Sequence, residues 1–309
     1  MTRGLESEAK KIKIKKVLLS PFRVLISIAK MNLKTKTGLS LMAIFVVISI
    51  LEPAINFYRL NGKSPLEIGD FAGYQPPSSS LPLGTDPYGR DIFALLLMGT
   101  RYTLTIGFVA GVIDILIGIT IGFLAGYKGG LVDHALRSIT DALLVIPTWP
   151  LVIFLTLYLK QIDIFSLALI IGVFGWPSVT RHLRSQVLSV KERPYIELAK
   201  LSGEGDLSII FKEIAPNILP YIGVGFAEAI LSAMMIETGF RMLIGVGPVN
   251  LVTLGYLVKL AISQGFLTTR LYAIIPPILF LVLIFVSLNL INIGLDDAYN
   301  PRLKKITGI

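Results

Sequence analysis

Six long apolar segments limit what this sequence can fold into. They cover residues 39–58, 102–126, 139–159, 164–180, 218–240 and 271–294. A helix needs about 20 apolar residues to cross the roughly 30 Å hydrocarbon core of a bilayer, so each segment is long enough or nearly so. The chain is 53% hydrophobic and 16% charged, whereas soluble domains are about 25% charged. We therefore expect an all-α polytopic membrane protein with six transmembrane helices, the fourth bent at its Gly-Trp-Pro sequence.

The basic residues predict how these helices are oriented. Of the 29 Lys and Arg residues, 21 lie in the N-terminal tail, the turn near Lys128, the loop 181–217 and the C-terminal tail. Loops rich in Lys and Arg stay in the cytoplasm, so both termini and the loop 181–217 are expected there. The loop 59–101 is then external, and its residues 91–98 predict a short helix at the outer interface. Basic residues placed beside spans account for the net charge of +9 without a nucleic-acid partner.

This topology divides the chain into four parts. Residues 1–38 form a basic cytoplasmic tail, 39–101 the first span with the external loop, 102–294 the core transmembrane domain, and 295–309 a cytoplasmic tail. The first forty residues lack the cleavage site of a signal peptide, so an uncleaved first span is expected. Alternating basic and apolar residues suit the N-terminal tail to an anionic lipid surface, and a solvated tail is the alternative.

The sequence offers no recognisable catalytic motif. The chain has no cysteine, which excludes disulfides, thiolate metal sites and thiol nucleophiles. Gly-Lys-Ser at 62–64 resembles the end of a nucleotide-binding loop, but Phe57 stands where that loop needs glycine. His134 and His182 have no partners at the spacing of metal ligands. We therefore expect a non-catalytic chain that binds neither metal nor nucleotide itself.

Acidic residues inside the spans are candidates for a substrate path. A charge in hydrocarbon is costly and usually faces a cavity or a partner. Asp114 lies near the middle of the second span, and Asp141 and Glu228 lie in the third and fifth. Hydrogen bonding between helices and coupling to protons are the alternatives for these residues.

Glycines recur every four residues along the second span. One ridge contains Gly118, Gly122 and Gly126, and Gly107 and Gly111 repeat the spacing. Such ridges allow close approach of helix backbones in lipid. The contact they predict lies within this chain or at a seam between subunits.

The loop 181–217 has the pattern of two short helices. Pro194 suits a first helical turn and Gly203 a helix end, which predicts a helix between them. A second helix is expected to begin at Asp206, whose carboxylate would cap it. It is expected to end at Ile214, because Pro216 cannot continue a regular helix.

An apolar stripe at helical spacing marks one face of this second helix. It consists of Leu207, Ile210, Phe211 and Ile214. We expect the stripe to pack under the membrane domain and to leave Ile209 and Glu213 outward. The outward face would then dock into a groove of a cytoplasmic partner, and a merely packed cytoplasmic loop is the alternative.

Two groups of residues resemble the cytoplasmic coupling motif of ATP-binding-cassette importer permeases. They are Glu197-x-Ala199-x3-Gly203 and Ile214-x-Pro216-Asn217. Leu198 stands where that family usually has alanine. The resemblance places the site that couples to the ATPase on Glu197, Ala199, Gly203, Asp206, Ile209, Ile214 and Pro216.

Further motifs are similar to the dipeptide/oligopeptide subfamily of these permeases, over roughly residues 81–302. The external signature is Gly84-Thr85-Asp86-x2-Gly89-Arg90-Asp91. The others are Gly99-x-Arg101, Ala125-Gly126-Tyr127-x-Gly129-Gly130-x2-Asp133 and Asn300-Pro301-Arg302. Two departures leave the substrate open: Ala94-Leu95 replace the usual Ser-Arg, and no Trp-Gly follows Gly245-x-Gly247.

The resemblance implies a type I importer permease fold and a set of partners. These are a homologous second permease, two cytoplasmic ATPase subunits that bind ATP and Mg, and an external solute-binding protein. The chain would form half of a pathway for di- or oligopeptides, with oligosaccharides as the alternative cargo. The residues alone leave open a different class, a self-contained carrier driven by an ion gradient.

Overall fold

The computed structural model describes residues 32–159, 162–244 and 251–299. Residues 1–31 of the basic tail, residues 245–250 and the Asn300-Pro301-Arg302 motif lie outside this description. The described part is helical and contains one isolated bridge, between Thr85 and Asp91, but no strand. The expected all-α fold is confirmed.

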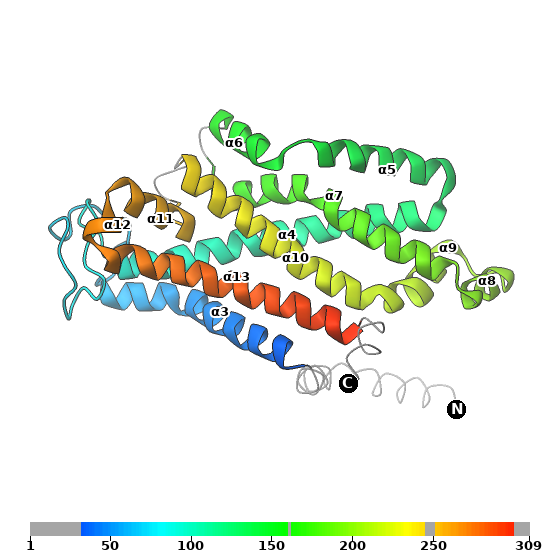
Figure 1. Ribbon diagram of the computed structural model, residues 1–309, viewed down its shortest axis with the longest axis horizontal. Helices are drawn as coiled ribbons and strands as arrows, with labels where there is room; N and C mark the ends of the chain where they lie inside the picture. The colour runs from blue at the N-terminus through cyan, green and yellow to red at the C-terminus, as the bar shows by residue number, and fades with distance from the viewer. Residues whose placement is uncertain (1–31, 160–161, 245–250, 300–309) are drawn as a thin grey trace, which may run out of the picture.

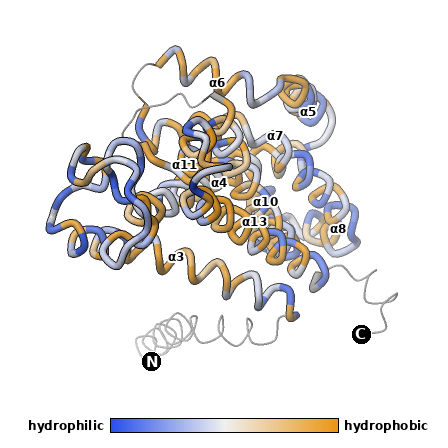
Figure 2. The backbone as a smooth tube through the Cα atoms, turned by 60° about the vertical axis from the view of Figure 1, so that its left-hand side comes forward, coloured by the Kyte–Doolittle hydropathy of each residue, from blue (hydrophilic) through white to orange (hydrophobic). Residues whose placement is uncertain are grey.

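Five long apolar helices form the bundle (Figure 1). They are α3 (Leu33–Arg59), α4 (Ile92–Lys128), α7 (Ile164–Lys191), α10 (Ala215–Ile244) and α13 (Leu271–Tyr299). Each is long and apolar enough to cross a bilayer. Hydrophilic residues gather in the loop between α3 and α4 and around α8 (Pro194–Leu201), while the long helices are mostly hydrophobic (Figure 2). Five of the six expected spans are therefore single helices.

The third expected span, 139–159, is broken. Helices α5 (Gly130–Val145) and α6 (Thr148–Tyr158) meet at an angle of 77°. Ile146, which precedes Pro147, has the extended backbone that a following proline favours, with ψ of 120°. Pro177 does not interrupt its helix. It lies inside α7, which is continuous through the Gly-Trp-Pro sequence where a bend is expected.

Helix α4 lies at the centre of the bundle and is longer than expected. It begins at Ile92, so the separate interfacial helix expected at 91–98 is wrong: those residues form the first turns of α4. Asp91 caps the helix by accepting the N–H of Phe93 at 2.9 Å. Leu95 and Leu96 are buried in the core, and no helix-breaking residue separates them from the rest of α4.

The glycine ridges of α4 pack against two neighbouring helices. A Cβ added at Gly118 would lie 2.6 Å from a methyl carbon of Val179 on α7, and one added at Gly107 would lie 2.2 Å from Cγ of Met234 on α10. Both distances are too short for a side chain to fit without movement of the neighbour. These ridges therefore make contacts within the chain, one toward each helix.

Two short helices cover the end of the bundle near the loop 60–91. They are α11 (Leu254–Ser263) and α12 (Phe266–Thr269). Thr253 caps α11, and Thr103 of α4 accepts the N–H of Leu254 at 3.0 Å. Hydropathy does not reveal α11 and α12, because both helices are too short to cross a membrane.

Candidate functional site

Segment 194–214 is the polar insert between α7 and α10, at the end of the bundle opposite the loop 60–91 (Figure 1). It contains α8, α9 (Asp206–Ile209) and η1 (Ile210–Ile214), a turn of π-helix that runs directly into α10. Both expected helices begin where the sequence predicts, α8 at Pro194 and α9 at Asp206.

Gly203 ends α8 as expected. Its φ of +79° is a conformation that favours glycine. The N–H of Glu204 bonds to the carbonyl of Ala199 at 3.1 Å, and the N–H of Gly203 bonds to that of Lys200 at 3.0 Å. This pair of bonds is a Schellman motif, which satisfies the last carbonyls of the helix. The chain therefore reverses at Gly203 and brings α9 back against α8.

The second short helix does not end before Pro216. Helix runs without a break from Asp206 to Leu243. The N–H of Ala215 bonds to the carbonyl of Ile210, five residues back. A π turn widens the backbone, which accommodates a following proline that lacks an N–H and would crowd a regular turn. Residues 206–214 are thus the beginning of a bundle helix rather than part of a separate loop.

The π turn changes which residues face inward. Ile209 and Ile214 are fully buried, whereas Leu207 and Phe211 are each 70% exposed. Residues five apart share a face across a π turn, while a regular helix places residues three or four apart together. The expectation that Ile209 faces outward is therefore wrong. The expectation that the apolar stripe packs inward is confirmed for Ile210 and Ile214 and wrong for Leu207 and Phe211.

A buried apolar cluster holds segment 194–214 against two bundle helices. From the segment it contains Ile196, Ile209 and Ile214, with Ile218 of α10. From α4 and α7 it contains Phe123, Tyr127, Val187 and Val190. The segment is therefore closely packed against the ends of α4 and α7.

Asp206 links the segment to α4 instead of capping a helix. The position before α9 is Gly205, and no side chain caps that helix. The Asp206 carboxylate accepts hydrogen bonds from the Tyr127 hydroxyl at 2.9 Å and the Lys128 ammonium at 2.5 Å. Lys200 of α8 lies over the Tyr127 ring, 5.6 Å from its centroid. The expected role as a cap is wrong, and the residue is a tether.

Four large apolar side chains on segment 194–214 face away from the bundle, and we call them the apolar patch. They are Leu198, Leu201, Leu207 and Phe211, with exposures between 63% and 80%. Glu197 and Pro216 are also exposed. Exposed apolar side chains gathered on one short segment are typical of a protein-binding surface. The helical stripe in the sequence predicts an inward position for Leu207 and Phe211, and no sequence pattern singles out Leu201.

The three acids expected to line a path do not meet in one site. Asp114 is 4% exposed on α4. Its carboxylate fills the space beside Gly175 of α7, where an added Cβ would lie 2.5 Å from Oδ2. Its Oδ1 has no hydrogen-bond partner among the described residues. The geometry of Asp114 is that of a group packed between two helices.

The other two acids pair with neighbouring residues of α7. Asp141 of α5 accepts a hydrogen bond from Arg181 at 2.7 Å. Glu228 of α10 lies 3.5 Å from Nδ1 of His182. Each acid therefore contacts α7 at its own position, and the structure brings no two of them together.

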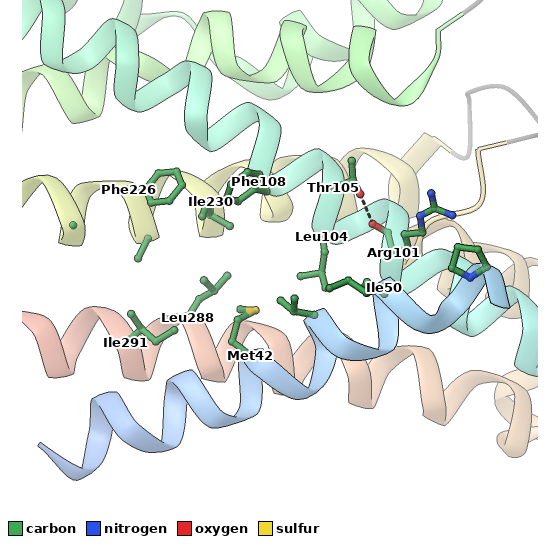
Figure 3. Close-up of a pocket in the computed structure, with 15 residues that line it drawn as sticks. Met42, Ile50, Arg101, Leu104, Thr105, Phe108, Phe226, Ile230, Leu288 and Ile291 are labelled. Atoms are coloured by element: carbon green, nitrogen blue, oxygen red, sulfur yellow. Dashed lines mark hydrogen bonds between the residues drawn. The ribbon is translucent and has the colours of Figure 1, made fainter. Parts of the chain in front are cut away.

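A cavity of about 730 Å³ lies between α3, α4, α10 and α13 (Figure 3). Its wall is mostly apolar and includes Phe108, Phe226 and Ile230. Arg101 lies at one end and forms an ion pair with Glu52 at 3.0 Å. None of the three acids lines this cavity. A peptide backbone needs many hydrogen-bond partners, and the polar side chains of this wall are limited to Ser49, Arg101 and Thr105, so we assign the cavity no part in the path.

The signature residues of the loop 60–91 form a compact turn that caps α4. They are Gly84, Thr85, Asp86, Gly89, Arg90 and Asp91. Asp86 and Arg90 are both 1% exposed in their side chains and form an ion pair at 2.6 Å. Asp86 also accepts the backbone N–H groups of Tyr88 and Arg90, each at 2.9 Å. These residues hold the loop together, and their burial prevents direct contact with a partner.

Removing one member of the buried pair should destabilise this turn strongly. In Asp86→Ala, Arg90 keeps its burial but loses its counter-charge, which costs about 3–5 kcal/mol. The matched control is Lys63→Gln in the same loop, where Lys63 is exposed and a hydrogen bond to Asp70 raises its pKa. We expect a lower unfolding midpoint in detergent for Asp86→Ala only. Equal midpoints for the two variants would contradict a structural role for the pair.

Comparison with known proteins agrees with this architecture. Residues 118–305 match the family described as binding-protein-dependent transport system inner membrane component. The oligopeptide transport system permease protein OppC of Bacillus subtilis is 29% identical, over 95% of this chain and 93% of that protein. The dipeptide transport system permease protein DppC of Alkalihalophilus pseudofirmus is 31% identical, over 92% and 91%. A probable peptide ABC transporter permease of Sinorhizobium fredii is 35% identical, over 78% and 81%.

The fold is also similar to a solved structure. A chain of the inward-facing MetNI methionine ABC transporter superposes with a TM-score of 0.52 at 18% identity, covering 67% of this chain and 96% of that one. The likeness supports the fold of a type I ABC importer permease. With the family match over most of the bundle and the two relatives above 30% identity, this chain belongs to the family of inner membrane components of binding-protein-dependent transport systems.

Proposed function

We propose that this chain is one permease subunit of an ATP-driven importer and forms half of its pathway for di- or oligopeptides. The observation that carries the proposal is the apolar patch. Leu207 and Phe211 of the patch lie on a helix that continues into the bundle as α10, and Leu198 and Leu201 lie on α8 beside it. The buried side of the segment packs against α4 and α7. A permease subunit that is driven by a separate ATPase needs an exposed surface to which that ATPase binds.

The side of the membrane follows from charge. The end of the bundle that bears segment 194–214 also bears Lys128, Arg184 and Lys191. The positive-inside rule assigns this end, together with both termini, to the cytoplasm of a cell. ATP is available there, so the partner on the patch is an ATPase, and two such subunits bind ATP and Mg in the assembled importer. A homologous second permease completes the pathway, and a solute-binding protein delivers cargo to the opposite end.

The proposed coupling is mechanical. An ATPase that grips the apolar patch and moves on ATP binding displaces α9. The Asp206 carboxylate, bonded to Tyr127 and Lys128, and the cluster around Ile209 then carry the displacement to α4 and α7. Packed helices respond as rigid bodies, so a small shift at the patch opens or closes the bundle elsewhere.

The cargo is inferred from the relatives. All of the relatives named above are described as peptide, dipeptide or oligopeptide permeases. A name is a weaker argument than a site, and the same machinery with an oligosaccharide as cargo is the alternative. A screen of the cognate solute-binding protein against peptides and oligosaccharides decides between these two classes.

Reconstitution tests the proposal against an ion-coupled carrier. We expect proteoliposomes that contain this chain alone to take up no peptide under a proton or sodium gradient. Uptake should require the second permease, the ATPases, ATP and the binding protein together. Gradient-driven uptake by this chain alone, abolished by Asp114→Asn or Asp141→Asn, would instead establish the carrier. Failure of both preparations to move any solute would indicate a scaffold.

A further inference from the structure

A second cavity, of about 450 Å³, lies between α4, α5 and α7. It is lined by Ala125 and by polar or charged residues, namely Arg137, Thr140, Asp141, Thr180, Arg181 and Arg184. It lies at the same end of the bundle as segment 194–214, because Ala125 is close to the end of α4 that contacts Asp206. None of these lining residues belongs to the apolar patch or to the cluster beneath it.

The cavity is lined by more positive than negative charges. Three guanidinium groups face one carboxylate, that of Asp141. Both oxygens of that carboxylate are already engaged, Oδ1 by Arg181 at 2.7 Å and Oδ2 by Arg137 at 3.4 Å. Arg184 is held from outside the lining by Asp133, through two bonds of 2.5 and 2.6 Å. The three guanidinium groups and the carboxylates of Asp141 and Asp133 together carry one net positive charge. Each guanidinium group has further N–H donors that could bind a ligand.

A buried hydroxyl in the lining lacks a partner. Thr180 is 2% exposed, and its Oγ1 makes no hydrogen bond within the described residues. Leaving a buried hydroxyl unsatisfied is costly, so such a group indicates a missing partner. An oxygen atom of a ligand in the cavity would accept its proton. This observation is independent of the arginines and points to the same kind of ligand, one rich in acceptor oxygens.

The depth of the cavity along the helices is that of lipid headgroups. Helix α7 has no charged residue from Ile164 through Thr180 and then begins its basic run with Arg181. No charged residue lies between Asp141 and the end of α6, or between Asp114 and Lys128 on α4. The uncharged stretches of α4, of α5 with α6, and of α7 therefore all end at this cavity. Lipid phosphates occupy that boundary, and basic pockets between transmembrane helices bind them.

We infer that this cavity binds the phosphate of an anionic phospholipid. The guanidinium groups of Arg137 and Arg181 donate to the phosphate oxygens, and the Thr180 hydroxyl supplies a further hydrogen bond from the buried side. The single negative charge of the headgroup neutralises the net positive charge of the five groups. Because α5 contacts the bundle here largely through ion pairs, with Thr140 as its one buried residue, the bound lipid also fastens α5 to α7.

Native mass spectrometry of the full-length chain in detergent, titrated with phosphatidylglycerol, tests this inference. We expect a bound lipid whose affinity falls about tenfold or more in Arg137→Gln and in Thr180→Val, because each change removes a hydrogen bond to a charged group. The matched control is Arg101→Gln, another half-exposed arginine paired with one carboxylate, at the other end of the bundle. The control should bind phosphatidylglycerol as the unaltered chain does.

The lipid is distinguished from free phosphate by a parallel titration with inorganic phosphate. Inorganic phosphate that binds at Arg137 and Thr180 while phosphatidylglycerol does not would overturn the lipid assignment. Equal lipid affinity in all four proteins, or equal loss in the Arg101→Gln control, would also overturn it. Arg137 is exposed and its replacement does not threaten folding, so the test stands even where Thr180→Val fails to fold.

Discussion

Replacing Phe211 by glutamate is expected to leave the permease folded and to prevent its assembly with the ATPases. Phe211 is 70% exposed, so its replacement leaves the core intact. Aromatic anchors at the centre of an interface contribute about 2 kcal/mol or more, and a buried unpaired carboxylate adds a further penalty. We expect the affinity for the ATPase to fall roughly thirtyfold or more, measured by titration of the detergent-solubilised permease with purified ATPase.

The control for this change keeps the apolar surface. Phe211→Leu retains an apolar side chain at the same position and should bind the ATPase within a few-fold of the unaltered chain. A Phe211→Glu variant that binds as tightly as Phe211→Leu would show that the apolar patch is not the docking surface. In that case the partner grips the segment elsewhere, or not at all.

Replacing Ile209 by alanine is expected to separate ATPase binding from transport. Ile209 is fully buried under the ends of α4 and α7, and truncation of such a side chain costs about 2–5 kcal/mol. The apolar patch stays on the surface, so the ATPases still bind. The segment, however, is loosened from the bundle. We expect faster hydrogen exchange in residues 194–214 and about a tenfold or greater loss of uptake per ATP hydrolysed.

Ile284→Ala provides the matched comparison for Ile209→Ala. Ile284 is equally buried, on α13, in a cluster that does not include segment 194–214. This variant should lose a similar amount of stability and yet keep its ratio of uptake to hydrolysis. If both variants have the same ratio of uptake to ATP hydrolysis, Ile209 contributes only to stability. Motion of the segment is then not transmitted through the cluster that contains Ile209.

Much of the bundle follows from hydropathy, because a membrane imposes one length on every span. The sequence predicts five helices that the structure contains, and the ridge of Gly118, Gly122 and Gly126 predicts their close packing. The bend between α5 and α6 is harder to foresee. Pro147 and Pro177 lie in similar apolar surroundings, and yet only the first interrupts its helix. Which proline breaks a helix depends on the neighbours that satisfy the freed backbone groups, and those are tertiary contacts.

The candidate site was predictable in position but not in orientation. The position of the segment, the start of α8 at Pro194 and its end at Gly203 are predictable from local residue preferences. The faces of the second helix are not, because a stripe at helical spacing assumes regular helix throughout. One π turn before Pro216 shifts the inward face of the helix: it places Phe211 on the surface and Ile209 in the core, while Ile214 stays buried as expected. A π turn has no compositional signature that a single sequence displays.

The Asp206 tether was missed for a related reason. A carboxylate at the start of a helix is usually a cap, and that local rule explains the expectation. Tyr127 and Lys128 are 79 and 78 residues away in sequence, at the end of α4. A contact of that kind is visible only once the chain has folded back on itself at Gly203.

The central claim is that segment 194–214 lies in the cytoplasm and contacts an ATPase, and a single introduced thiol tests it directly. The chain has no cysteine, so Leu201→Cys and Tyr88→Cys each create one unique site, at opposite ends of the bundle, both exposed. In assembled importer within sealed inside-out vesicles, a thiol-specific cross-linker should join position 201 to the ATPase and leave position 88 uncoupled. Cross-linking at position 88, or none at position 201 when assembly is intact, would contradict the account.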